Sequence, residues 1–226
     1  MALLRRESER VNRMLDMAPP EVSRAYEEVM GGAAPQYDAA VRAVLRHCPT
    51  AHSVLDVGTG PGFLPPRLAR AYPLAEVTGI DTGPEMLAIA RKRAAAEGVA
   101  DRVTIVEGSG YAIPFPDSAF DLVVATNTIH MFDDLPRFAS EVRRVLATGG
   151  SLVVMDYRRD VPWPIYALMW GSTFTVRALR KPVSGMGPVI DACYTKSEVD
   201  GVLSDAGFAS QNVSTGVARL EAWAQA

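Results

Sequence analysis

Residues 54–62, Val-Leu-Asp-Val-Gly-Thr-Gly-Pro-Gly, decide how this chain folds. Three apolar residues and an aspartate are typical of a short buried strand, and glycines at alternate positions then lead into a helix expected over residues 63–71. A strand that turns into a helix through glycines exposes backbone amides and keeps side chains away from a ligand. In an open parallel sheet such a turn lies at the carboxyl ends of the strands, where ligands bind. The sequence therefore predicts a ligand site at this turn.

The composition is that of an ordinary globular protein, because 48% of the 226 residues are hydrophobic and 22% are charged. This length suits one large domain. The net charge of -3 and the lack of a dense basic run argue against a nucleic-acid partner or an anionic membrane surface. The short basic triplet Arg91-Lys92-Arg93 is interpreted as a solvated helix face.

Cysteine usage and the N-terminus bear on where the protein works. Cys48 and Cys193 lie far apart and have no metal-ligand neighbour at a useful spacing, so we expect neither a disulfide scaffold nor a metal site. The N-terminus is charged from Arg5 onward and lacks the apolar run of a signal peptide. No stretch approaches the length of a membrane span. We therefore expect a cytoplasmic protein.

After the glycine turn the sequence alternates between strand and helix patterns. Strands are expected at 53–57, 76–80, 102–107, 120–126 and 151–155. Helices are expected at 84–97, 135–147 (stopped by residues 148–150) and 195–205. Two final strands, 208–214 and 217–224, are joined by a two-residue Thr215-Gly216 turn and are therefore antiparallel. This order predicts an α/β fold: a Rossmann-like doubly wound sheet, mostly parallel, with a C-terminal antiparallel hairpin.

Two segments stand outside this alternation. We expect a single domain over residues 1–226, with residues 1–48 as an N-terminal helical cover that has a loop at 31–35, and residues 157–194 as an inserted substrate cover. The second segment is rich in large side chains, which are candidates to line an apolar pocket: Trp163, Tyr166, Met169, Trp170 and Phe174, with Tyr26 and Tyr37 closing it from the N-terminal side. The alternative, that this stripe is ordinary helix core, stays open.

The spacing of the glycines separates two classes of nucleotide site. The dinucleotide fingerprint needs a small residue where this chain has Phe63 or Pro65, and prolines at 65 and 66 remove amide donors that a pyrophosphate would use. Asp81 ends the next strand, where a carboxylate accepts both hydroxyls of a ribose. The residues therefore favour a ligand with a ribose and without a pyrophosphate, and S-adenosylmethionine fits this description.

Four segments in order resemble the class I S-adenosylmethionine-dependent methyltransferases, and among them the small-molecule branch that includes ubiquinone/menaquinone-biosynthesis-type enzymes. They are VLDVGTGPG at 54–62, GIDTGPEML at 79–87, EGSGYAIPFPDSAFDLVVATNTIHMF at 107–132 and LATGGSLVVMD at 146–156. The resemblance covers residues 50–156 and, more loosely, 195–226.

The resemblance implies that the glycine turn holds the methionine part of the cofactor. Gly58, Gly60 and Gly62 would let the backbone pass close to it, and Thr59 belongs to the same turn. Asp56 would accept a hydrogen bond from the amino group of the cofactor. In the alternative reading, Asp56 only caps the turn by bonding its amides.

The nucleoside part would lie beside the second and third strands. The resemblance implies that Asp81 holds the ribose, while Thr82 and Met86 flank the adenine. Many relatives have Asp and Ala where this chain has Ser109 and Gly110, so a hydroxyl replaces a carboxylate at the adenine. As alternatives, Asp81 is a helix N-cap and Met86 is plain helix core.

The acceptor side is marked by residues that follow the fourth and fifth strands. Thr126 and Asn127 would face the methyl-bearing sulfonium by the resemblance. His130 is the candidate general base, because imidazole titrates near neutrality. Asp156 and Tyr157 are further catalytic candidates. A histidine that bonds a loop carbonyl and an aspartate that caps a loop are the structural alternatives.

We therefore expect an S-adenosylmethionine-dependent methyltransferase that acts by direct displacement on a small, apolar or aromatic organic acceptor. This acceptor is the expected partner, and a homodimer is compatible with the sequence. Two alternatives stay open: a non-catalytic regulatory protein that binds S-adenosylmethionine, and a nicotinamide-dependent oxidoreductase.

Overall fold

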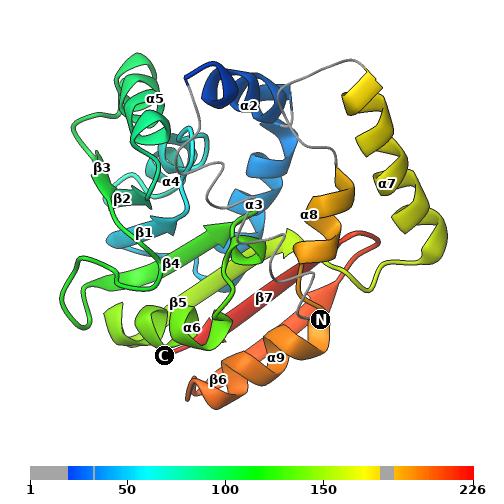
Figure 1. Cartoon of the computed structure of the whole chain (residues 1–226). Helices are drawn as coiled ribbons and strands as arrows, with labels where there is room; N and C mark the ends of the chain where they lie inside the picture. Colours follow the sequence, from blue (N-terminus) through cyan, green and yellow to red (C-terminus); the bar gives the residue numbers. More distant parts are fainter. Residues whose placement is uncertain (1–19, 33, 179–185) are drawn as a thin grey trace.

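The computed structural model describes residues 20–32, 34–178 and 186–226. One seven-stranded sheet organises them, with the strand order β3-β2-β1-β4-β5-β7-β6 (Figure 1). The strands are β1 (Ser53–Val57), β2 (Glu76–Asp81), β3 (Val103–Glu107), β4 (Phe120–Thr126), β5 (Leu146–Tyr157), β6 (Ser210–Thr215) and β7 (Arg219–Gln225). The first five pair in parallel, and β7 is antiparallel to both of its neighbours, β5 and β6.

Helices cover both faces of the sheet (Figure 1). One face packs against α3 (Ala34–His47), α4 (Pro65–Ala71) and α5 (Pro84–Ala96), and the other against α6 (Leu135–Val145) and α9 (Lys196–Asp205). The remaining helices are α2 (Pro20–Gly32), the 3-10 turn η1 (Ile129–Met131), α7 (Trp163–Ala178) and α8 (Met186–Ala192). Within the described residues, none of these helices is long and apolar enough to cross a membrane.

The predicted fold class is confirmed. The near-continuous apolar run of β4 is buried along almost its whole length, as a central parallel strand requires. The Thr195 side chain accepts from the Glu198 amide and the Glu198 side chain accepts from the Thr195 amide, which forms the predicted capping box at the start of α9. Gly98 and Gly207 have φ of 69° and 76° just after helices, as C-terminal caps do.

Three local predictions were wrong. Residues 148–150 do not merely stop a helix but lie inside β5, where Gly149 has a φ of 79° and the register against β4 shifts between Phe120 and Leu122. The final hairpin turns through residues 216–218, because Thr215 already pairs with Leu220. The expected loop at 31–35 is nearly absent, since α2 runs to Gly32 and α3 begins at Ala34.

The N-terminal helix α3 is fixed to the last strand. Glu221 of β7 accepts hydrogen bonds from Arg46 Nη2 at 2.8 Å and pairs with His47 Nε2 at 2.8 Å. The His47 ring also stacks on Trp223, with 5.6 Å between ring centroids. These contacts join residues 174 positions apart and hold α3 across the sheet.

The preceding helix α2 is tied to the glycine turn through Arg93. Arg93 Nη2 lies 2.6 Å from a carboxylate oxygen of Glu27, its Nε donates to the carbonyl of Pro61 at 2.9 Å, and its guanidinium lies 3.7 Å from the centroid of the Phe63 ring. Arg91 likewise donates to the carbonyl of Ile105. The interpretation of the basic triplet as a solvated face was therefore wrong for Arg93, whereas Arg91 and Lys92 are exposed as expected.

Candidate functional site

The turn between β1 and α4 is shaped by close packing. Gly58 has a φ of 72°, and a Cβ there would lie 2.1 Å from the Thr128 hydroxyl. Gly62 has a φ of 75°, and its Cβ would lie 2.7 Å from that of Ala90. Gly60 differs, because its φ is 52° but nothing lies within 4 Å of an added Cβ. Packing therefore requires two of these glycines, while the third borders open space.

This turn is held at the carboxyl edge of the sheet by the end of β2. The amides of Gly58 and Thr59 donate to the carbonyl of Ile80, each at 2.9 Å. The two carboxylate oxygens of Asp81 accept from the amides of Gly60 at 2.8 Å and Gly83 at 2.9 Å. Gly83, not Asp81, is the N-cap of α5, so the helix-capping alternative for Asp81 was wrong.

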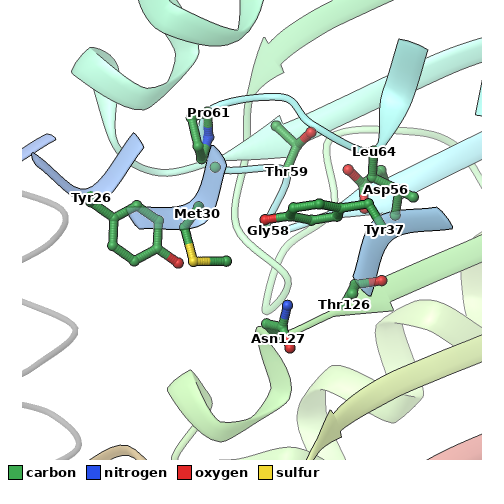
Figure 2. A pocket seen from close by; sticks show the side chains of 11 residues that line it. Tyr26, Met30, Tyr37, Asp56, Gly58, Thr59, Pro61, Leu64, Thr126 and Asn127 are labelled. Carbon is green, nitrogen blue, oxygen red and sulfur yellow. The ribbon is translucent and has the colours of Figure 1, made fainter. Parts of the chain in front are cut away.

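A small cavity of about 30 Å³ lies against the turn (Figure 2). Its lining combines the end of β1, the turn, the end of β4 and two N-terminal helices: Tyr26, Met30, Tyr37, Asp56, Gly58, Thr59, Gly60, Pro61, Leu64, Thr126 and Asn127. Six of the predicted cofactor residues therefore meet at one place. Met30, Pro61 and Leu64 were not predicted as site residues, since their apolar side chains carry no signal in the sequence.

Several polar atoms in this cavity are buried without a hydrogen-bond partner among the described residues. They are Asp56 Oδ2, Thr59 Oγ1, Thr126 Oγ1 and Asn127 Nδ2. Burial raises the pKa of Asp56 to about 7, with a further contribution from the charge of Asp81. Such unpaired groups are costly unless a ligand meets them. Their chemistry fits an amino-acid group, whose ammonium donates to Asp56 and whose oxygens accept from Asn127.

Two tyrosines lie on the N-terminal side of this cavity, whereas the apolar pocket that they were expected to close involves residues 157–194 and stays a prediction. Figure 2 shows Tyr26 and Met30 of α2 and Tyr37 of α3 facing the glycine turn. Burial raises the pKa of Tyr26 to about 12 and that of Tyr37 further, so both phenols stay neutral. These side chains leave the space of about one water molecule over the turn.

The predicted adenine side lies apart from this cavity. Thr82 is exposed and Met86 is buried. Ser109 Oγ accepts from the amide of Tyr111 at 3.2 Å. A Cβ at Gly110 would lie 2.5 Å from the Phe132 ring, so packing explains the glycine that stands where relatives have alanine.

The two best catalytic candidates from the sequence are in contact. His130 Nδ1 lies 2.9 Å and 3.0 Å from the two carboxylate oxygens of Asp156, which is completely buried. The same carboxylate accepts from the amides of His130 at 3.2 Å and Tyr157 at 2.7 Å. An ionised Asp156 places the proton on Nδ1 and leaves Nε2 as the basic nitrogen of the ring.

Cys193 completes a buried cluster that its sequence spacing did not reveal. Its thiol and the ligand atoms of His130 and Asp156 all lie within 4.8 Å of one another. Burial, together with the charge of Asp156, raises the thiol pKa, so Cys193 stays protonated. Both Cys48 and Cys193 are buried free cysteines, as expected for a chain without a disulfide scaffold.

Arg219 is a charged residue near the site that the sequence reasoning missed. It begins β7 opposite Tyr157 and donates from Nη2 to Asn127 Oδ1 at 2.6 Å. Its guanidinium lies 4.6 Å from the centroid of the Tyr157 ring. The available signal was a single charge at the start of an alternating strand, which sequence patterns alone do not distinguish from an ordinary exposed residue.

The expected aromatic lining of the inserted segment was partly wrong. Trp163 and Phe174 of α7 are 75% and 66% exposed, so they line no pocket. Tyr166 donates to Asp191 of α8 at 2.9 Å, and Trp170 lies against Gly187 of α8. The helix therefore packs mainly on α8 (Figure 1). The Ser-Gly-Met-Gly-Pro sequence at 184–188 predicts a flexible stretch, which falls partly outside the described residues, as does the part of the expected N-terminal cover before residue 20.

Comparison with known proteins agrees with this geometry. The methyltransferase domain family matches residues 55–154. Over 104 residues the chain is 44% identical to the demethylmenaquinone methyltransferase of Thermus thermophilus, covering 46% of each chain. Over 110 residues it is 34% identical to ajmaline N-methyltransferase of Rauvolfia serpentina, covering 48% of this chain and 38% of that protein. The chain thus spans about half the length, or less, of these curated relatives.

The fold agrees with a solved structure as well. A SAM-dependent methyltransferase from Aquifex aeolicus superposes with a TM-score of 0.61 at 24% identity, covering 77% of this chain and 81% of that one. The matched domain contains the glycine turn, Asp81, Thr126 and Asn127. Residues 55–154 thus match the methyltransferase domain family, and the chain is similar to demethylmenaquinone methyltransferases over this part.

Proposed function

We propose that this chain transfers a methyl group by direct displacement from S-adenosylmethionine to a small, apolar or aromatic organic acceptor. The observation that carries the proposal is the buried, unpartnered carboxylate oxygen of Asp56 beside a glycine turn with open space at Gly60. A ligand with an ammonium group satisfies this carboxylate, and S-adenosylmethionine carries one next to its activated methyl group on a positively charged sulfur.

Different residues around the turn would contact different parts of the donor. Asp56, Thr126 and Asn127 would meet its amino-acid part, because they are the groups with unmet hydrogen bonds in the cavity. Asp81 would accept from the ribose hydroxyls, because each carboxylate oxygen can accept more than one hydrogen bond. Thr82, Met86, Ser109 and Gly110 would border the adenine.

The segments that cover the site would limit the acceptor to a small molecule. Residues 1–48 form an N-terminal cover in this proposal, and residues 157–194 form the cover of the acceptor. The cavity of about 30 Å³ is smaller than the donor, so the donor would need more space over the turn than α2 leaves here. Closure by Tyr26, Met30 and Tyr37 would then exclude water and leave room for a small molecule.

His130 is the proposed general base, with Asp156 as its positioning residue. The carboxylate fixes the imidazole through Nδ1, so Nε2 takes a proton from the acceptor. Alignment of donor and acceptor supplies much of the remaining rate enhancement, about 7–11 kcal/mol in favourable cases. Tyr157 follows Asp156 and would contact the acceptor.

Labelled-methyl transfer tests the proposed function. The protein is incubated with methyl-labelled S-adenosylmethionine and a cell metabolite extract, and the labelled product is identified. We expect label in a small organic molecule, accompanied by S-adenosylhomocysteine. Binding of the donor without any transfer would favour the non-catalytic alternative. Thermal protection by NAD or NADP, but not by S-adenosylhomocysteine, would favour the oxidoreductase.

The raised pKa of Asp56 predicts a pH-dependent affinity. Ionised Asp56 pairs with the ligand ammonium, so affinity for S-adenosylhomocysteine should rise through pH 7 in calorimetric titrations. Because the folded-state pKa of about 7 exceeds the ordinary value of 3.8, stability without ligand should fall as the pH rises from 3.8 to about 7. Asp56→Asn should therefore bind more weakly and yet melt at a higher temperature at pH 8.

A control for this experiment lies at the opposite end of β1. Asp121 accepts from the amides of His52 at 2.8 Å and Ser53 at 3.1 Å, away from the cavity. Asp121→Asn should lower stability and leave ligand affinity unchanged. An Asp56→Asn variant that binds as tightly as the wild type at pH 8 would exclude the ammonium pairing.

The Gly60→Ala variant should show an effect on ligand binding in addition to the effect of backbone strain on stability. Its matched control is Gly98→Ala, because both glycines have left-handed φ, 52° and 69°, and open space at the added Cβ. Each substitution should cost about 1–2 kcal/mol of unfolding free energy in urea titrations. Only Gly60→Ala should weaken S-adenosylhomocysteine binding, by about tenfold or more. Equal affinities for the two variants would place the cofactor away from Gly60.

His130→Gln should lower kcat on the identified acceptor by about 100-fold or more while the affinity for S-adenosylhomocysteine stays unchanged. Asp156→Asn should reduce kcat less and shift its pH profile, because the imidazole loses its charged partner. His47→Gln is the control, since His47 pairs with Glu221 away from the cavity. Full activity of His130→Gln across the pH range would assign His130 a structural role.

A further inference from the structure

The side-chain amide of Asn127 has two ends of opposite character, and the one that faces the cavity decides what it attracts. The backbone of this residue is fixed, because its amide donates to the carbonyl of Met155 at 2.8 Å and its φ is 54°. The amide nitrogen of the side chain donates hydrogen bonds, whereas the oxygen accepts them. A nitrogen in the cavity attracts a carboxylate, and an oxygen in the same place repels it.

Arg219 removes this choice of orientation. A guanidinium has only donors, so the atom of Asn127 that faces it must be the oxygen. Arg219 Nη2 lies 2.6 Å from Asn127 Oδ1. The amide nitrogen is therefore left on the other side, and Figure 2 shows it pointing towards the glycine turn. Asn127 Nδ2 is buried there and lacks a hydrogen-bond partner among the described residues.

The guanidinium of Arg219 is itself held by two further elements. Its Nη1 donates to Gln36 Oε1 of α3 at 3.3 Å. It also lies 4.6 Å from the centroid of the Tyr157 ring at the end of β5. Arg219 and Tyr157 pair in register across β7 and β5, and side chains that pair in this way lie on the same face of a sheet. The position of the group that orients Asn127 is therefore set by contacts with α3 and β5.

We propose that Arg219 is a positioning residue that makes the site selective for a donor with a carboxylate, because it holds Asn127 Nδ2 towards the cavity. The proposal rests on the proposed function, in which Asn127 meets the amino-acid part of S-adenosylmethionine. Asp56 accepts from the ammonium of that part, and Asn127 Nδ2 donates to its carboxylate. A buried donor that a ligand leaves unpaired is costly, so a ligand without a carboxylate binds more weakly.

Three ligands separate this role from a purely structural one when each is titrated by calorimetry into the full chain. S-adenosylhomocysteine has both the ammonium and the carboxylate, its decarboxylated analogue keeps only the ammonium, and 5'-methylthioadenosine has neither. The wild type should bind S-adenosylhomocysteine about tenfold or more tightly than the decarboxylated analogue. We call this ratio of affinities the carboxylate preference. A residue that only stabilised the fold would not change the preference.

Substitutions at position 219 should change the carboxylate preference according to the group that they place beside Asn127. Arg219→Lys keeps a donor and should keep most of the preference. Arg219→Met removes the donors and should lower it. Arg219→Glu supplies an acceptor that draws Asn127 Nδ2 away from the cavity, so the preference should be lost. The affinity for 5'-methylthioadenosine should stay unchanged in all three, and thermal melting identifies a variant that does not fold. If Arg219→Glu does not fold, Arg219→Met decides.

Arg158→Met is the matched control for the loss of charge. Arg158 also neighbours Tyr157, but its Nε pairs with Asp160 at 2.8 Å. This variant should leave the carboxylate preference unchanged. A loss as large as that in Arg219→Met would assign the effect to net charge and overturn the proposal.

The Asn127→Ala background tests whether Arg219 acts through Asn127. In this background, Arg219→Met should cause no further change in the carboxylate preference. A further loss would show that Arg219 contacts the donor carboxylate itself and would overturn the proposal. A wild type without the preference, or an Arg219→Met variant that keeps it in full, overturns the proposal as well. These results leave the proposed function standing, whereas a wild type that binds no S-adenosylhomocysteine overturns both.

Discussion

The steric contact between Gly58 and Thr128 is the constraint on which the site depends. A side chain at position 58 would lie 2.1 Å from the Thr128 hydroxyl, so the turn after β1 and the chain after β4 meet only because a hydrogen replaces a methyl group. This close approach brings Thr126 and Asn127 beside Asp56 and creates the cavity. The parallel strands β1 and β4 end at the same edge of the sheet. The absence of a side chain at Gly58 determines how closely the segments after these strands approach each other.

Several buried polar atoms that lack a hydrogen-bond partner among the described residues lie at this same edge of the sheet. Asp56 has a pKa raised to about 7 because it is buried, and Asn127 has a left-handed φ of 54° that asparagine tolerates better than most residues. Backbone strain and buried charge both lower stability and persist at functional sites. The Asp156 carboxylate, by contrast, accepts from the His130 ring and from the amides of His130 and Tyr157, which holds the imidazole in one orientation.

The order of the sheet could be predicted from the sequence because its signals are local. Apolar runs, glycines after helices and the capping box at Thr195 each act within a few residues, and the matches to the family segments fix their order. The functional site was harder to predict from the sequence than the fold. Its place in the basic triplet predicts that Arg93 faces solvent. In the structure, Arg93 instead pairs with Glu27 and donates to the carbonyl of Pro61, which lie 66 and 32 residues away. Cys193 and Arg219 likewise reach the site only through tertiary folding. Trp163 and Phe174 were expected to line a pocket, but both side chains are exposed in the structure.

The position of β7 has a consequence for how the molecule is assembled. This strand lies between β5 and β6 although it is the last in the sequence, and its Glu221 also anchors α3 at a separation of 174 residues. During synthesis, α3 therefore leaves the ribosome long before its anchor exists. Contacts of such sequence separation slow folding. The pairing of Glu221 with α3 therefore forms only after β7 has been made, although α3 also packs on α4 and β5.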